Sequence, residues 1–254
     1  MFEIWIALLI NLFAGILIFL LGLFWPVIPK SYRKYLVRRF WGKGALGQDF
    51  VITYGAFLDS RLTQNNPPPF RYVKSYHDGR TIQFAGPWGN VVADAEVRSI
   101  SYLINALSAY KESAVTVEND TTAFENLDRT IVALGSGSSN QITDIILREP
   151  NNGFLEFRQE GNTSFIFDKR GGAKFIGFQG TVKKDYGMIL KIPNLRFPDR
   201  FFFVCAGLGE WGTSGASWYL ATKWRDLLSE FKEAFGIVVE VDLGSDQSAR
   251  RVFP

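Results

Sequence analysis

Two glycine-rich segments carry the residues best suited to binding a small molecule. Each follows an apolar run and precedes a segment with helical spacing, so each should form a strand-to-helix turn. The ligand-binding candidates are Gly135, Ser136, Gly137, Ser138, Ser139 and Asn140 in the first segment, and Gly207, Gly209, Gly212, Thr213 and Ser214 in the second. Glycines let backbone N–H groups approach an anion, and the helix dipole favours negative charge there. The two turns predict a phosphate-sized or carboxylate-sized site, although tight turns and helix caps use the same residue types.

Several other chemistries are excluded by what the chain lacks. Neither segment matches the dinucleotide-binding G-x-G-x-x-G pattern or the P-loop, so NAD-type chemistry is not supported and no cofactor is predicted. His77 is the only histidine and Cys205 the only cysteine, so a Cys/His zinc site cannot be built and no metal is predicted. Ser-His-Asp catalysis would depend on one loop histidine, which disfavours it.

A third segment, QFAGPWGN at residues 83–90, is similar to the aromatic-Leu-Ala-Gly-Pro-Phe loop of the nucleoside deoxyribosyltransferases, which share a flavodoxin-like fold with TIR domains. The resemblance covers Phe84 to Asp94. It implies a carboxylate near a sugar carbon, as nucleophile or as stabiliser of an oxocarbenium ion. If the protein is an enzyme, the catalytic candidates are Asp94, Glu96 and Glu210. In the alternative interpretation, Asp94 and Glu96 are first-turn acids stabilised by the helix dipole.

A broader pattern extends over residues 48–243 and joins three motifs: GSGSSN at 135–140, DYGMILKIPN at 185–194 and AGLGEWGTSGA at 206–216. It resembles an uncharacterised bacterial, membrane-anchored Rossmann-like module. The resemblance implies an α/β fold and points to the loops that contain these three motifs, but it does not imply any activity. Trp211 and Tyr186 lie beside glycines in these motifs, where a nucleic base could stack on them, or where they could pack over their own loops.

The elements that position these loops read as one mixed α/β domain. We expect strands at 50–54, 81–86, 113–120, 130–137, 200–208 and 236–243, and helices at 91–112, 141–149 and 213–235. Between residues 154 and 193, alternating apolar segments are separated by NNG, EGN, RGG and KKD, which are hairpin signals. The sequence predicts a Rossmann-like mixed sheet, parallel at its centre, with an antiparallel hairpin region.

The N-terminal segment predicts a membrane anchor. Ile4 to Trp25 form an apolar run of 22 residues broken only by Asn11, and about 20 such residues cross a bilayer core as a helix. Six cations follow without an acid between them: Lys30, Arg33, Lys34, Arg38, Arg39 and Lys43. This excess predicts an N-terminus outside and a C-terminal domain in the cytoplasm. A cleaved signal peptide is disfavoured because the start is acidic and no small-residue cleavage site follows.

These features divide the chain into a transmembrane anchor (1–28), a basic juxtamembrane linker (29–47) and a cytoplasmic Rossmann-like domain (48–254). The chain has 28 basic and 25 acidic residues, net +3. Without the six cations and Glu3 the count is 22 against 24, so no excess of positive charge favours nucleic-acid binding. The six cations can also rest on anionic lipid headgroups.

Three functional hypotheses remain. In the first, a single-pass membrane protein binds a nucleotide-like or other anionic small molecule in its cytoplasmic domain and acts as a sensor or effector, with association of several membrane helices into a homo-oligomer as its output. In the second, the protein is a membrane-tethered enzyme acting on a nucleotide or N-glycosidic bond. In the third, it is a non-catalytic membrane scaffold. The lack of a nucleophile–base pair, a metal cluster or a usable histidine favours the sensor over the enzyme.

Overall fold

The computed structural model describes residues 27–55, 71–75, 79, 81–85, 92–110, 114–177 and 183–254. A seven-stranded mixed sheet forms the centre of this part, in the order β12-β11-β9-β10-β5-β1-β4. Its adjacent parallel strands are β4 (Thr116–Asn119), β1 (Phe50–Tyr54), β5 (Thr130–Leu134) and β10 (Phe201–Gly207). Its antiparallel partners are β9 (Lys184–Pro193), β11 (Phe235–Asp242) and β12 (Arg250–Phe253). The predicted mixed α/β class is confirmed, but the parallel strands form one side of the sheet, from β10 to the edge strand β4, and not its centre.

Two smaller antiparallel sheets accompany the central one. The first is the predicted hairpin region, with strands β6 (Leu155–Glu160), β7 (Thr163–Asp168) and β8 (Lys174–Ile176). The second pairs β2 (Arg71–Ser75) with β3 (Thr81–Ala85) between β1 and the next helix. Although β9 belongs to the same alternating stretch, it lies inside the central sheet, because its run Gly187 to Ile192 is buried on both faces.

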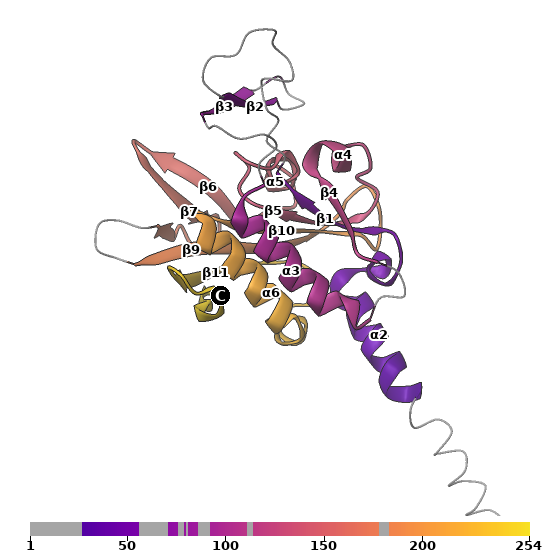
Figure 1. The fold of residues 1–254 in the computed structure, drawn as a ribbon. Coiled ribbons are helices and arrows are strands. Elements are labelled where there is room, and N and C mark those ends of the chain that lie inside the picture. Colours follow the sequence, from indigo (N-terminus) through magenta and orange to yellow (C-terminus); the bar gives the residue numbers. More distant parts are fainter. Residues whose placement is uncertain are drawn as a thin grey trace, which may run out of the picture.

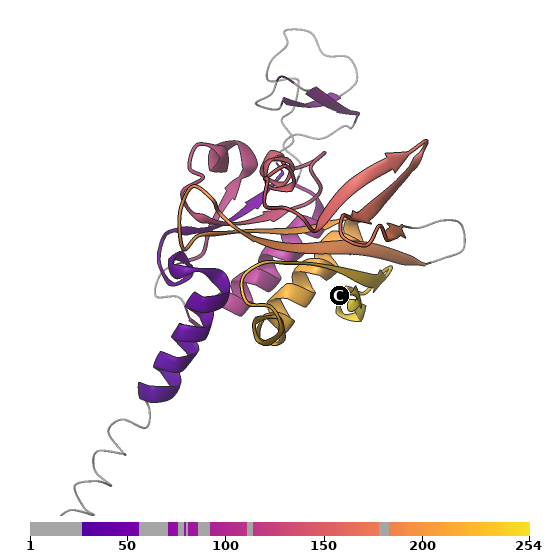
Figure 2. The same cartoon turned by 180° about the vertical axis from the view of Figure 1, so that it is seen from behind.

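Helices cover both faces of the central sheet. α3 (Asp94–Ser108) and α6 (Glu210–Glu230) lie side by side across one face (Figure 1). α4 (Asp120–Phe124), α5 (Gln141–Leu147) and the three-stranded sheet lie on the other (Figure 2). α6 begins three residues earlier than the spacing predicts, so Gly212 belongs to its first turn instead of the loop before it.

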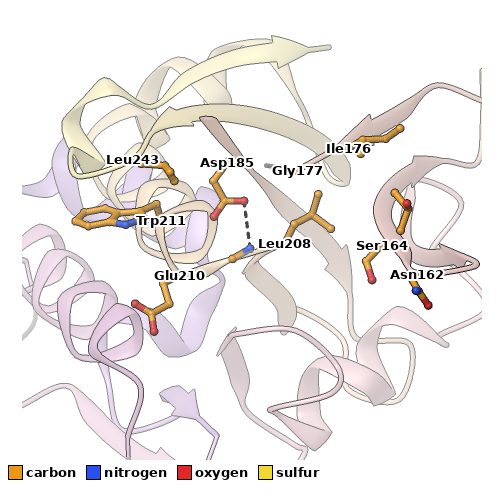
Figure 3. A pocket seen from close by; sticks show the side chains of 11 residues that line it. Asn162, Ser164, Ile176, Gly177, Asp185, Leu208, Glu210, Trp211 and Leu243 are labelled. Atoms are coloured by element: carbon orange, nitrogen blue, oxygen red, sulfur yellow. Dashed lines mark hydrogen bonds between the residues drawn. The ribbon is translucent and has the colours of Figure 1, made fainter. Parts of the chain in front are cut away.

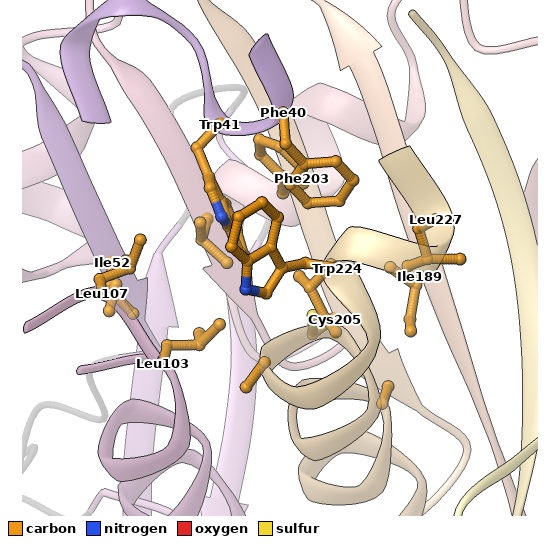
Figure 4. Packing of buried hydrophobic residues seen from close by; sticks show 14 of the residues in the cluster. Phe40, Trp41, Ile52, Leu103, Leu107, Ile189, Phe203, Cys205, Trp224 and Leu227 are labelled. Atoms are coloured by element: carbon orange, nitrogen blue, oxygen red, sulfur yellow. The ribbon is translucent and has the colours of Figure 1, made fainter. Parts of the chain in front are cut away.

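The core divides into two clusters because successive strand residues point to opposite faces. On β1, Phe50 and Ile52 join the cluster beneath α3 and α6, whereas Val51 joins the cluster beneath α5. Figure 4 shows the first cluster, in which Phe203 and Cys205 of β10 meet Trp224 of α6. Cys205 is buried there, as its apolar run predicts.

The segment expected as a basic linker is folded. α2 (Val27–Trp41) continues into the 3-10 helix η1 (Lys43–Leu46), and Val37, Phe40 and Trp41 have no exposed surface. The Phe40 ring lies 5.8 Å from that of Trp224, and the Trp41 ring lies 5.0 Å from that of Phe203. The C-terminal end of α2 therefore belongs to the core of the domain, while its N-terminal end extends away from it (Figure 1).

Among the helices of the described residues, none combines the length and the apolar character needed to cross a bilayer. The predicted anchor, Ile4 to Trp25, lies outside those residues. So do residues 86–90 of the QFAGPWGN segment, whose first three residues, Gln83, Phe84 and Ala85, fall in β3.

Candidate functional site

The carboxyl ends of β1, β5 and β10 meet at one edge of the sheet, where α3 and α6 begin. A cavity of about 200 Å³ lies at this edge. Eight predicted site residues line it: Glu96, Gly135, Ser136, Ser139, Gly207, Gly209, Glu210 and Thr213. In open α/β sheets ligands bind at this edge, outside the carboxyl ends of the strands. The structure thus brings both glycine-rich segments and two of the three predicted carboxylates to one place.

Glu96 is the buried carboxylate of this cavity. Its exposed fraction is 2%, and its Oε1 accepts the backbone N–H of Gly55, at the end of β1, over 3.3 Å. A Cβ atom on Gly135 would lie 2.7 Å from the same oxygen. Gly135 also has a φ of +86°, a conformation that favours glycine. The lack of a side chain at Gly135 therefore leaves room for the carboxylate across the ends of β1 and β5.

The other two predicted carboxylates differ in position. Glu210 is the first residue of α6; it is exposed and lines the same cavity as Glu96. Asp94 does not line it: its side chain is 72% exposed and pairs with Arg98 one turn along α3. The interpretation of Asp94 as a first-turn acid of the helix matches this geometry.

Asp185, at the start of β9, occupies the N-terminus of α6. Its Oδ2 accepts the N–H of Gly212 over 2.6 Å, and its Oδ1 accepts the N–H of Gly209 over 3.1 Å (Figure 3). Burial raises the pKa of Asp185, and hydrogen bonds from Gly212, Tyr186 and Gly209 oppose that rise. The N–H groups of Gly209 and Gly212, two that the sequence offers to an anion, are therefore bound to the protein's own carboxylate.

The N-terminus of α5 is satisfied in the same way. The buried side chain of Asn140 accepts the N–H groups of Ile142 and Thr143 over 2.9 and 3.3 Å, as a helix N-cap does. Asp120 accepts the N–H of Gln141 over 2.8 Å. Asn140 thus has a structural role, and the N–H groups of Gln141, Ile142 and Thr143 at the start of α5 are bound to side chains of the protein itself.

Three residues of the second glycine segment hold the helix against its neighbours. Ser214 donates to Asp246 over 2.5 Å and accepts from Arg98 over 3.1 Å, which joins α6 to α3 and to the 3-10 helix η3 (Asp246–Ser248). The Thr213 hydroxyl accepts the N–H of Gly207 over 2.9 Å. A Cβ on Gly212 would lie 2.3 Å from the carbonyl oxygen of Tyr186, so glycine permits the close contact of α6 with β9.

Two larger cavities adjoin the small one, and all three share Leu208. One, of about 490 Å³, also shares Gly209 and Glu210 with it and adds Trp211 and Ile176 (Figure 3). One face of Trp211 is covered, because the Arg98 guanidinium lies 4.4 Å from its ring centroid.

The other adjoining cavity, of about 600 Å³, lies between the first glycine segment and β6. It is lined by Ser136, Gly137 and Ser138 on one side and by Arg148 and Arg158 on the other. Sequence reasoning missed both arginines and Asp185. The motif DYG marked Asp185, but nothing in the sequence placed its carboxylate at α6 or the arginines beside the serines.

Within the described ranges, no group of three or more His, Cys, Asp and Glu side chains is arranged to hold a metal ion. No protein-family model, curated protein or solved structure matches the chain. The geometry of this edge is therefore the basis for any functional conclusion.

Proposed function

We propose that the carboxyl edge of this Rossmann-like domain binds a nucleoside-like or nucleotide-like molecule through the hydroxyl groups of its sugar, in a sensor or effector tethered to the membrane by its N-terminal segment. The observation that carries the proposal is the pair of glutamates, Glu96 and Glu210, in one cavity between the two glycine turns. Carboxylates accept strong hydrogen bonds from hydroxyl groups, and an acidic residue plays this part for ribose in dinucleotide-binding folds.

The size and charge of the cavities support this assignment. No described residue that lines the small cavity is basic, which favours a hydroxyl-bearing group over a phosphate there. Its volume of about 200 Å³ is below the roughly 300–1,000 Å³ of ordinary ligand sites, so it fits part of a ligand. A base would extend toward Trp211, and a phosphate would extend toward Arg148 and Arg158. Asp144 lies 3.2 Å from Arg148, and Glu156 pairs with Arg158. A phosphate would therefore compete with these two acids for the guanidinium groups of the arginines.

Calorimetric titration of the full-length protein in a non-ionic detergent tests the proposal, with adenosine, AMP, ATP, NAD and UDP-glucose as probes. The Glu96→Gln variant should bind the best probe at least tenfold more weakly, because a hydrogen bond to a charged group contributes about 1.5–3 kcal/mol. Glu125→Gln, an exposed glutamate outside the cavities, is the matched control and should bind normally. If no probe binds, or if both variants bind equally well, the proposed site is wrong.

A second candidate is hydrolysis of an N-glycosidic bond, and the burial of Glu96 beside a second carboxylate favours it. The bond from the sugar carbon to the base nitrogen would break, water would supply the new C–O bond, and its proton would go to the leaving base. Glu96 would stabilise the positive charge on the sugar. Chromatography of NAD and adenosine incubated with the protein tests this: a base released by the wild type but not by Glu96→Gln supports an enzyme, and intact probe after binding supports the sensor.

A further inference from the structure

A basic cavity lies at the other end of the domain, where α2 enters the core. It has a volume of about 750 Å³ and is lined by residues of α2, by the loop before β10, and by the segment after α6. Phe201, the first residue of β10, forms part of its wall, so the cavity is at the amino edge of the parallel strands. The candidate ligand site lies at the opposite edge.

Positive charge is in excess here. Arg38, Arg39, Lys43 and Lys232 line the cavity against two acids, Asp199 and Glu233. Lys43 pairs with Asp199 over 2.5 Å. The side chains of Arg38, Arg39 and Lys232 are exposed and form no ion pair with a described residue. Three of the four cations that line the cavity are therefore in no ion pair with a described residue, although Glu233 lines the same hollow.

A fifth cation lies behind the wall of this cavity. Lys191 of β9 is 1% exposed, and its Nζ lies 4.2 Å from the ring centroid of Phe201 and 4.8 Å from that of Phe40. The ring centroid of Phe203 lies 5.8 Å from the same atom. A buried ammonium among aromatic faces is costly. The charges that act most on Lys191 are Glu233 and Arg39, both of which line the cavity, so an anion bound there would also offset the ammonium.

We propose that the basic cavity at the base of α2 binds a phosphate-bearing anion. Guanidinium groups bind phosphate oxygens in a bidentate manner, and Arg38 and Arg39 of α2 bring two of them to the hollow together with Lys232. α2 directly follows the predicted membrane segment, and Tyr32 and Tyr35 on it are more than half exposed, as interfacial tyrosines are. The phosphorylated headgroup of a bilayer lipid and a soluble phosphate compound share this chemistry, and the two can be separated by experiment.

The test is binding to the full-length protein in a non-ionic detergent. One arm titrates inositol hexakisphosphate by calorimetry, and the other counts bound lipid by native mass spectrometry in micelles that contain phosphatidic acid or, for comparison, phosphatidylcholine. Binding in the first arm identifies a soluble phosphate compound as a ligand. Retention of phosphatidic acid over phosphatidylcholine in the second identifies a lipid headgroup. Either result supports the proposal.

Charge-removing variants locate the site. The double substitution Arg39→Gln and Lys232→Gln should weaken binding at least tenfold in whichever arm is positive. The matched control is Arg33→Gln with Lys223→Gln, two exposed cations on α2 and α6 that do not line the cavity, and it should bind as the wild type does. Because all four side chains are exposed, thermal melts should confirm that both variants stay folded. Absence of binding in both arms, or equal loss in the two double variants, would overturn the proposal.

Discussion

Glu96 and Gly135 are matched at the carboxyl edge of the sheet. Glu96 is buried because α3 carries it across the ends of β1 and β5, and the missing side chain of Gly135 leaves the space that its Oε1 occupies. Each residue alone has an ordinary explanation, as a helix acid or a turn glycine. Together they define where a ligand group can meet a carboxylate, so the stability of this edge and ligand binding should be coupled.

Substitution of Gly135 by alanine should therefore affect stability and binding together. The new Cβ would lie 2.7 Å from both Glu96 Oε1 and Ser139 Oγ, at a φ of +86°. We expect a loss of about 2–4 kcal/mol in the free energy of unfolding, from backbone strain plus displacement of the two side chains. Gly244→Ala shares a positive φ but has open space around it, so it should lose only about 1–2 kcal/mol. Urea denaturation measures both, and equal losses would contradict the clash.

Because Lys191 is buried, we expect the stability of the protein to depend on pH. Burial lowers its pKa to about 7, whereas an unfolded chain keeps lysine protonated up to about pH 10. Between about pH 7 and pH 10 the chain takes up a proton at Lys191 when it unfolds, so the free energy of unfolding increases as pH rises. Below about pH 7 Lys191 is protonated in both states, and the free energy of unfolding no longer depends on pH through this group. From pH 7 to 9 the gain should be on the order of 2 kcal/mol. Denaturation of the wild type and of Lys191→Met at both pH values checks this: the difference between them should shrink as pH rises.

At the scale of elements, three helices begin at the candidate site, and in two of them, α5 and α6, side-chain acceptors bind N–H groups of the first turn. The N-terminus of α3 has no side-chain cap. Asp185 of β9 binds the first turn of α6, and Asn140 with Asp120 binds that of α5. A helix dipole neutralised by an internal carboxylate has little left for an external anion. This is the physical reason to assign the small cavity to hydroxyl groups and to look for phosphate beside arginines.

Loss of the Asp185 cap should destabilise the protein strongly. Asp185→Ala leaves the N–H groups of Gly209, Gly212 and Tyr186 without their acceptor in a part-buried site. Each unsatisfied buried donor costs about 1–3 kcal/mol, so we expect a loss of at least about 2 kcal/mol in urea denaturation. Asp226→Ala, an exposed position on the same helix, should change stability by less than about 0.5 kcal/mol. If Asp185→Ala is equally mild, the cap is not formed in solution.

On the scale of the whole molecule, α2 connects the core of the α/β domain with the predicted membrane segment. Its C-terminal end packs under α6 and against β10, and its N-terminal end leads toward the predicted membrane segment. The basic cavity lies at this junction and the candidate ligand site at the opposite edge of the same sheet. Because Val37, Phe40 and Trp41 of α2 are packed in the core, a change at the sheet can reach α2 through packed side chains.

The packing of α2 into the core of the domain can be tested by mutation. Phe40→Ala should cost about 3–5 kcal/mol, the usual loss for a large core aromatic, because the ring contacts Trp41, Phe203 and Trp224. Tyr32→Ala, two turns earlier on the exposed part of α2, should be nearly neutral. The measurement is urea denaturation of the full-length protein in detergent. A neutral Phe40→Ala would mean that α2 is a linker after all, as its charge first indicated.

The sequence by itself determined the elements and their class. Apolar runs and helical spacing predict the parallel strands, α3, α5 and α6, because local periodicity records which face of an element is buried. It also identified both glycine segments and, through Glu96 and Glu210, the two carboxylates of the cavity. The predictions of a membrane anchor and of its orientation rest on hydropathy and charge alone.

Only the tertiary structure decided how these parts meet. It inserted β9 between β10 and β11, put Asp185 on the first turn of α6, turned Ser214 toward Asp246, and buried the end of a segment rich in arginine. Each of these depends on contacts between residues far apart in the chain, and a local sequence pattern does not show which distant residue a side chain will contact. The same holds for the basic cavity, where Arg39 and Lys232, nearly two hundred residues apart, line one hollow.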